Sequence, residues 1–496
     1  MVKSSGGQRE SDGVVVPPIG VKHNTPGGKG PDFGHADRGG TREGMAGTAR
    51  SKPPDGQTPV VLHRLRPVGK VQQLQRQLWA AAKQSPERRF HALYDRIFRA
   101  DVLEEAWRRV RSNRGAAGVD RITLADVEAY GVERMLDELA RDLRAGRYRP
   151  APVRRQAIPK PDGGVRPLGI PTVRDRVAQQ AARLVLEPIF EADFLPVSYG
   201  FRPKRTATMA LETIRTGFIA GSGWVAEADI RSFFERIDHV VVLRLLERRV
   251  SDRRVHKLVR GWLTAGVMAE GSVRATVAGA PQGGVISPLL ANIVLHELDR
   301  QWRSADGVLV RYADDFVVLA RSRGQAEAAL VRAGAILAEL GLELHPDKTK
   351  VVDLGDGREG FDFLGCHFHA RVSGRLLERG IRRYYLQRWP SQRAQKRLRE
   401  KIEAHTGRNR CHADIRETIA VINPILRGWG TYFRTGNAAR VFNALDGYVV
   451  DRLRSLLVKR QGRHLAPGQS RTWTREWFES HGLYRLRGTV RYPGAA

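Results

Sequence analysis

Apolar residues recur at helical spacing through much of the first half of the chain. Between Gln72 and Ser112, the stretches Leu78–Ala82 and Phe98–Trp107 carry apolar residues every three or four positions among basic ones. The segment Gly115–Asp120 breaks this pattern, which then resumes. Further helices are expected over about 125–145, 174–191, 206–219 and 240–265.

Short runs of apolar and β-branched residues predict strands between these helices. Residues 153–170 alternate between apolar and polar positions, and Pro161–Gly164 in their middle is a strong signal for a hairpin turn. Other strands are expected near 224–230, 273–278, 308–320, 341–353 and 361–368. Helices mixed with mainly antiparallel strands are typical of an α+β fold.

The character of the chain changes after about Gly374. Basic residues crowd this region, and Tyr384, Tyr385 and Trp389 lie between them. We therefore expect a separate, mostly helical and basic domain. The basic residues are Arg379, Arg382, Arg383, Arg388, Arg393, Lys396, Arg397, Arg399 and Lys401.

The composition points to a polyanionic partner. Lys and Arg outnumber Asp and Glu by 84 to 53, which gives a net charge of +31 and favours salt-dependent binding of nucleic acid. An anionic membrane is the alternative, but no long uncharged apolar run is present, so no membrane partner is expected. The two cysteines, Cys366 and Cys411, lie far apart and offer neither a zinc cluster nor a disulfide framework. With no apolar signal core at the N-terminus, a cytoplasmic, nucleic-acid-associated location is expected.

The tetrad Tyr312–Asp315 is the most informative stretch of the sequence. It places Asp314 and Asp315 between two apolar, strand-like runs, 308–311 and 316–320. Unpaired buried charge is costly, and a divalent cation is the usual compensation. Magnesium prefers carboxylate oxygen and leaves room for substrate phosphates, and two such ions can clamp a phosphoryl transfer. The alternative is an ordinary hairpin with an Asp-Asp turn.

A third carboxylate stands at the end of another predicted strand. The run Trp224–Ile230 delivers Asp229 just before a turn, where it can meet a hairpin from elsewhere in the chain. Asp229, Asp314 and Asp315 would together supply the side chains of a two-metal site. Taken by itself, Asp229 is also explained as the N-cap of the next helix.

Three further motifs carry groups suited to phosphates. The hairpin over 158–171 places Lys160 on one arm and Arg166 on the other, so both can reach a triphosphate. A glycine-rich turn exposes Gln282 at the mouth of an apolar helix, where backbone can approach a ligand. Lys348 follows a proline in the third motif and faces either phosphate or solvent.

In this order and spacing, the motifs resemble those of the reverse transcriptases encoded by group II introns. The resemblance covers roughly residues 70 to 490 and rests on seven ordered blocks. Besides the blocks described above, it includes Arg176–Ala181, Ser198–Pro203, Phe361–Gly365 and Asn423–Phe433. The resemblance implies a right-hand polymerase with the hairpin of Tyr312–Asp315 in its palm, followed by an α-helical thumb or maturase domain.

The implied domain limits divide the chain into five segments. These are a flexible basic leader over 1–57, a helical extension with the start of the fingers over 58–150, fingers and palm over 151–372, a thumb or maturase domain over 373–462, and a short C-terminal segment over 463–496 with possible DNA contacts. That last segment has no cysteine and no paired metal-ligand spacing, so it resembles members that lack an endonuclease domain.

The resemblance also implies residue roles. Asp229, Asp314 and Asp315 would hold two Mg²⁺ ions with the backbone carbonyl of Ile230. Tyr312 would lie at the primer end. Nucleotide contacts would come from Lys160, Arg166, Phe234, Gln282 and Lys348. Phe234 is equally well explained as a core aromatic.

The implied function is RNA-directed DNA synthesis together with assistance to splicing. The implied partners are group II intron RNA, an RNA template with a DNA primer, a DNA target and deoxynucleoside triphosphates. RNA contacts are expected from Arg382, Arg383, Lys396, Arg397 and Arg427. Stacking is one reading of Trp429, Tyr432 and Phe433, and the core of a helical bundle is the other.

Two other functions stay open at this point. One is a splicing factor without polymerase activity, which the intact acids Asp229, Asp314 and Asp315 argue against. The other is a related reverse transcriptase recruited for defence or repair, which fused nuclease modules would favour, and none is visible in the sequence.

Overall fold

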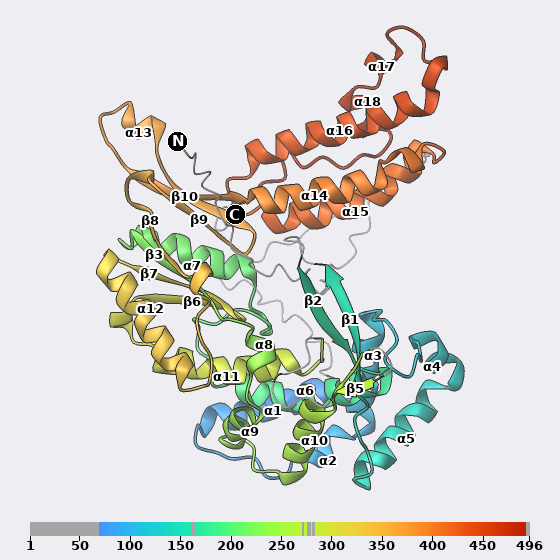
Figure 1. Cartoon of the computed structure of the whole chain (residues 1–496), viewed down its shortest axis with the longest axis vertical. Helices are drawn as coiled ribbons and strands as arrows, with labels where there is room; N and C mark the ends of the chain where they lie inside the picture. The colour runs from blue at the N-terminus through green and yellow to red at the C-terminus, as the bar shows by residue number, and fades with distance from the viewer. Residues whose placement is uncertain (1–68, 160–163, 270–271, 275–278, 280–282, 493–496) are drawn as a thin grey trace, which may run out of the picture.

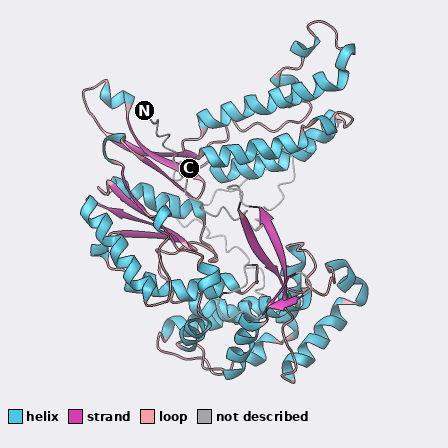
Figure 2. Cartoon of the chain, in the orientation of Figure 1, coloured by secondary structure: helices cyan, strands magenta, loops and turns pink. Residues whose placement is uncertain are grey.

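The computed structural model of this chain describes residues 69–159, 164–269, 272–274, 279 and 283–492. The expected leader over 1–57 lies outside these residues, as do Lys160 and Gln282. Within the described residues, helices and small, mainly antiparallel sheets are mixed as the α+β prediction requires (Figure 2). No helix there is both long and apolar enough to cross a bilayer.

A layer of helices packs around one fully enclosed helix, α6 (Val173–Glu191). Fifteen of its nineteen residues are buried, which is the pattern of a helix surrounded on all sides. Its neighbours are α1 (Lys70–Gln84), α2 (Tyr94–Ile97), α3 (Ala100–Ser112) and α5 (Val132–Arg144), with α4 (Leu124–Tyr130) against α5.

A long hairpin rises from this helical layer (Figure 1). Strands β1 (Val153–Pro159) and β2 (Val165–Ile170) pair antiparallel, as the turn signal between them predicts. Strand β4 (Val267–Ala269) adds to β1 in parallel, and β5 (Ser272–Arg274) completes the sheet.

The central sheet has strand order β6-β7-β3-β8 and is antiparallel throughout. Its strands are β3 (Trp224–Asp229), β6 (Val308–Tyr312), β7 (Asp315–Ala320) and β8 (Lys350–Asp353). Both faces are covered, with α12 (Arg323–Ala338) on one side and α7 (Ala207–Ile219) on the other. This double burial explains why the strands are apolar runs rather than alternating sequences.

The helices α8 (Phe233–Arg236), α9 (His239–Glu247), α10 (Arg253–Thr264) and α11 (Ser287–Gln301) link these layers. Helix α11 is buried along most of its length and runs beneath the turn between β6 and β7. It begins after a glycine-rich turn and has Pro288 in its first turn, where a missing N–H costs nothing.

One predicted strand and one region predicted to be helical differ from the structure. Only 350–353 of the expected strand over 341–353 forms a regular strand, because Pro346 opens a 3-10 turn over Pro346–Lys348. Residues Tyr384–Pro390, expected in a helical region, form strand β11, and their burial alternates with the period of two that a strand requires.

Strand β11 belongs to a three-stranded sheet that crosses the expected domain limit at 372/373. It pairs with β10 (Cys366–Val372), which also pairs with β9 (Gly360–Phe363), and α13 (Gly374–Leu377) caps the hairpin. The apolar core beneath this sheet runs without interruption into the helical part of the chain.

The helical part consists of α14 (Gln392–His405), α15 (Ile415–Phe433) and α16 (Ala439–Gln461), with short helices α17 (Gln469–Thr472) and α18 (Arg475–Ser480). In its described part, the segment over 463–496 packs against the helical part. Phe478 and Leu486 are fully buried in the same core. The Asp446 carboxylate of α16 accepts hydrogen bonds from Leu486 N (2.9 Å) and Arg487 N (2.8 Å).

We predict that Phe478→Ala lowers the free energy of unfolding by about 3–5 kcal/mol, because it leaves a cavity in this core. Denaturant titration followed by circular dichroism measures the loss. Val421→Ala on the exposed side of α15 is the control and should change stability by less than about 0.5 kcal/mol. Equal effects of the two substitutions would show that the C-terminal segment does not dock as described.

Candidate active site

The tetrad Tyr312–Asp315 forms the tightest kind of β-hairpin. Tyr312 faces Asp315 in the register of β6 and β7, so Ala313 and Asp314 alone make the turn. Ala313 has φ +59°, a left-handed conformation that side chains other than glycine rarely adopt. Two-residue hairpins need such an angle, and surrounding structure must hold it in place.

One part of that support is Gly200, which lies directly against the turn. A Cβ atom added there would sit 2.3 Å from Ala313 N and 2.9 Å from the Tyr312 carbonyl carbon. Backbone hydrogen bonds join the same loop to β6: Tyr199 N donates to Arg311 O and Arg311 N donates to Val197 O, both at 2.9 Å. Only glycine allows the loop to approach the turn this closely.

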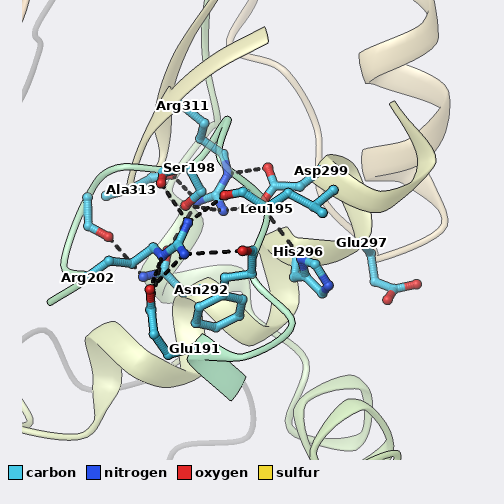
Figure 3. A network of polar contacts seen from close by, with 12 residues as sticks. Glu191, Leu195, Ser198, Arg202, Asn292, His296, Glu297, Asp299, Arg311 and Ala313 are labelled. Atoms are coloured by element: carbon cyan, nitrogen blue, oxygen red, sulfur yellow. Dashed lines mark hydrogen bonds and ion pairs between the residues drawn. The ribbon is translucent and has the colours of Figure 1, made fainter. Parts of the chain in front are cut away.

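The second part is a network around the Arg311 side chain, shown in Figure 3. Arg311 and Asp299 of α11 are both fully buried and form a two-pronged ion pair, with Nε donating to Asp299 Oδ1 at 2.7 Å. The remaining donors of the guanidinium reach Ala313 O at 2.9 Å, Ser198 Oγ at 2.8 Å and Asn292 Oδ1 at 3.2 Å. The turn that carries Asp314 is thus tied to a buried charge pair.

Neighbouring groups complete the network in Figure 3. Asn292 Nδ2 donates to Gly200 O at 2.9 Å, which joins α11 to the loop under the turn. Arg202 pairs with Glu191 and donates to Ser198 O at 2.7 Å. Burial lowers the pKa of His296 beside Asp299, so this imidazole is neutral near pH 7 and brings no second cation to Asp299.

Asp229 meets this hairpin through the central sheet. Strands β3 and β7 pair so that Asp229 lies directly opposite Asp315, one residue from Asp314. The three acids therefore gather at one end of the sheet although 85 residues separate Asp229 from Asp314 in the chain.

The segment Glu343–His345 fixes the end of β3. His345 N donates to Asp229 O at 2.8 Å and Arg231 N donates to Glu343 O at 3.0 Å, on either side of a bridge between Ile230 and Leu344. These hydrogen bonds are made by Asp229 and Arg231, the residues on either side of Ile230. The Ile230 carbonyl therefore takes no part in the pairing between these two segments.

Burial, together with the charges of the neighbouring acids, disfavours the charged form of Asp315. Desolvation, followed by the negative charges of Asp314 and Asp229, raises the pKa of Asp315 well above its usual range. Lys348 partly compensates, since its Nζ lies 3.1 Å from Asp229 Oδ2. The site is therefore short of positive charge.

This charge imbalance suits divalent cations. In the described part of the chain, no three acidic, histidine or cysteine side chains form a ready-made metal cage. Mg²⁺ does not require one, because it commonly binds through one or two carboxylates and takes its other ligands from waters and substrate phosphates. Asp229 and Asp314, with Asp315 beside them, fit that kind of ion.

Two aromatic candidates are described by the structure, and Tyr312 is the one that lies opposite Asp315. Tyr312 is half-buried against the core that continues into the helical part, and burial raises the pKa of its hydroxyl. Phe234 in α8 is also half-buried and packs edge-on against buried Phe233, with ring centroids 5.2 Å apart. Phe234 thus contacts the core and still keeps an exposed part.

The nucleotide-binding candidates are described only in part. Lys160 and Gln282 lie outside the described residues, and for Arg166 the structure gives the backbone position in β2, opposite Ile158. The turn that follows Gln282 is fixed nearby: Gly283 packs against β2, where an added Cβ would lie 2.4 Å from Gly169 O. Val285 N also donates to the buried Gln179 of α6 at 2.8 Å.

The basic candidates of the C-terminal half lie at the surface. Arg382, Arg383, Lys396 and Arg427 are exposed, and Arg397 is half-buried. Among the aromatic residues of α15, Phe433 is buried, and Trp429 and Tyr432 pack against the same core. Phe433 is therefore a core residue, and Trp429 and Tyr432 contact that core while staying half-buried.

Sequence reasoning missed Arg311, Asp299 and Asn292. A visible signal existed, because Arg311 interrupts an apolar strand and Asp299 interrupts an apolar helix. Charges at such positions are rarely buried unless they are paired. Nothing in the sequence said that the two would pair with each other.

Comparison with known proteins gives the family of the chain. Residues 158–368 match the reverse transcriptase (RNA-dependent DNA polymerase) family, and residues 395–477 match the group II intron maturase-specific domain. The chain is 36% identical to Protein YkfC of Escherichia coli over 339 residues, which cover 60% of this chain and 87% of that protein. The chain belongs to the family of group II intron reverse transcriptases and maturases.

Other relatives of this reverse transcriptase are longer proteins. It is 40% identical to the group II intron-encoded protein LtrA of Lactococcus lactis over 212 residues, which cover 42% of this chain and 35% of LtrA. It is 28% identical over 410 residues to an uncharacterized 91 kDa protein in the cob intron of Schizosaccharomyces pombe, covering 68% of this chain and 50% of that protein.

We predict that Asp299→Leu lowers the free energy of unfolding by about 3–5 kcal/mol, because it leaves Arg311 buried without its partner. The double variant Arg311→Met with Asp299→Leu should recover at least about half of that loss. Its primer extension should nevertheless stay low, since Ala313 O has lost its donor. Denaturant titration and single-turnover extension measure the two effects. Additive stability losses, or wild-type extension by the double variant, would contradict this role of the pair.

Proposed function

We propose that this protein is an RNA-directed DNA polymerase of the group II intron type. It copies intron RNA into DNA for mobility and binds the same RNA to assist its splicing. The observation that carries the polymerase part is the position of Asp229 opposite Asp315 and beside Asp314, at the end of the central sheet. Both matched domains support the two activities.

In the proposed mechanism, Asp229, Asp314 and Asp315 hold two Mg²⁺ ions together with the Ile230 carbonyl. When bound, these ions lower the pKa of the primer 3′-hydroxyl and neutralise charge on the departing pyrophosphate. Lys348, whose Nζ lies 3.1 Å from Asp229 Oδ2, would supply positive charge near that pyrophosphate.

The other groups position the substrates in this proposal. Tyr312 lies where it can contact the primer end. Lys160 and Arg166 grip the triphosphate of the incoming deoxynucleotide from the β1–β2 hairpin, and Gln282 contacts the same nucleotide. Phe234, which is half-buried, would exclude nucleotides that carry a ribose 2′-hydroxyl.

The proposed layout follows these roles. Fingers and palm take up residues 151–372, and the thumb or maturase domain begins at 373 within the β10–β11 hairpin. RNA template and DNA primer lie between them, and Arg382, Arg383, Lys396, Arg397 and Arg427 contact intron RNA. A DNA target is the expected substrate for insertion, with the segment over 463–496 as a candidate contact.

We predict that Asp314→Ala abolishes primer extension on poly(rA) with oligo(dT) in Mg²⁺, by at least about a thousandfold, because metal-held charge stabilisation is lost. Binding of the template–primer should stay within about threefold of wild type. Fluorescence anisotropy measures the binding. Asp356→Asn, which removes an exposed charge and keeps a side chain suited to the left-handed backbone there, is the matched control and should retain full activity. Undiminished extension by Asp314→Ala would refute the metal assignment.

Splicing is tested separately. Intron RNA that flanks the reading frame should splice slowly at physiological magnesium, and wild-type protein should accelerate it. The Asp314→Ala variant should accelerate splicing as wild type does, since RNA binding does not need the acids. Equal splicing rates with and without protein would remove the maturase activity from the proposal and leave the polymerase.

A further inference from the structure

The sheet formed by β9, β10 and β11 has two different faces. Phe361, Phe368 and Leu386 point into the apolar core that continues through the helical part. The alternate residues of the same strands point the opposite way. We call this second face the sheet platform, made of His367, His369, Arg371, Tyr385, Gln387 and Trp389.

Strand register places these side chains in three adjacent rows. His367 lies opposite Trp389, His369 opposite Gln387 and Arg371 opposite Tyr385. Tyr385 and Trp389 are four residues apart on one strand, a spacing of about 13 Å. The rows thus form a continuous strip of rings and cationic or polar groups along the hairpin.

Trp389 is the most unusual member of the strip. Tryptophan normally buries its ring against apolar side chains, yet Trp389 belongs to neither apolar core of the described residues. It contacts the imidazole of His367 with centroids 5.1 Å apart, and the guanidinium carbon of Arg371 lies 4.6 Å from its ring centroid. The residue as a whole is half-buried.

The surroundings orient these groups and add positive charge. His367 Nδ1 lies 2.7 Å from Asp362 Oδ1, which fixes the imidazole beside Trp389. Tyr385 is 39% exposed, and the Arg383 guanidinium lies over its ring at 5.5 Å. Arg382 is held over Tyr384 in the same way at 5.6 Å. Tyr384 neighbours Tyr385 on the strand and so points to the opposite face, which leaves Arg383 as the arginine beside the platform.

Most of the platform falls between the two matched domains. The reverse transcriptase match ends at residue 368 and the maturase match begins at 395, so Arg371, Tyr385 and Trp389 belong to neither. The surface is therefore not explained by either domain's own chemistry.

We propose that the sheet platform binds an unpaired segment of RNA by stacking bases on Trp389 and Tyr385. This inference rests on the proposed function, since the protein must hold intron RNA. Exposed rings spaced along a sheet with cationic rims match the chemistry of single strands, whose bases are free to stack. A duplex keeps its bases inside the helix and offers such rings no faces. A bound protein would favour apolar neighbours over two histidines and arginines.

The test compares three variants by fluorescence anisotropy with a twelve-nucleotide oligo(rU). Trp389→Leu should weaken binding by about five- to 150-fold, the loss expected for one stacked base. Trp389→Phe keeps a ring and should bind within about threefold of wild type. Trp79→Leu removes a tryptophan that is more exposed than Trp389 but lies on α1, and it should bind as wild type does. Circular dichroism melts show whether each variant is folded.

Photocrosslinking locates the contact independently. An oligo(rU) that carries 5-iodouridine should crosslink to peptides with Trp389 or Tyr385, as identified by mass spectrometry. Binding of oligo(dT) as tight as that of oligo(rU) would overturn the assignment to RNA. Unchanged affinity of folded Trp389→Leu, or crosslinks only elsewhere, would overturn the platform itself. Wild-type primer extension is measured alongside: its absence would refute the proposed polymerase, and its presence leaves a negative platform result as a failure of this inference alone.

Discussion

The buried pair of Arg311 and Asp299 is the constraint on which the site depends. A charge pair with no exposed surface stabilises a fold little by itself, because desolvation offsets most of its attraction. Its value here is geometric. The planar guanidinium holds a helix carboxylate with two donors and still reaches Ala313 O, so the strained turn has one position relative to α11. Because Asp314 is part of this turn, the position of its backbone is fixed as well.

The sheet extends the same constraint to the other acids. Pairing of β3 with β7 places Asp229 opposite Asp315, and apolar cores on both faces leave the strands no freedom to slip, since a shift by one residue would turn every side chain to the wrong face. Rigid strands thus force together carboxylates that repel each other. Lys348 relieves part of the repulsion, and what remains favours cations that arrive with a substrate.

The sequence predicted the α+β class and the strand ends that carry Asp229 and Asp314, because apolar runs ending in acids are local patterns. It did not predict the pairing of Arg311 with Asp299, which depends on how α11 crosses β6. Strand β11 was missed because Arg388 and the basic residues near it made the segment look like part of a solvent-exposed helix. In the structure Arg388 is buried and donates a hydrogen bond to Glu212, so it belongs to the buried half of the strand's alternating pattern. Packing of 463–492 was missed because its buried residues are few and scattered among polar ones.

The most direct measurement is anomalous diffraction at the manganese edge from crystals of the protein with template, primer, an incoming nucleotide and Mn²⁺. We expect two anomalous peaks about 3.5–4 Å apart. They should lie between the carboxylates of Asp229 and Asp314, with Arg311 still bonded to Ala313 O. A structure with bound nucleotide whose peaks lie away from these carboxylates would contradict it.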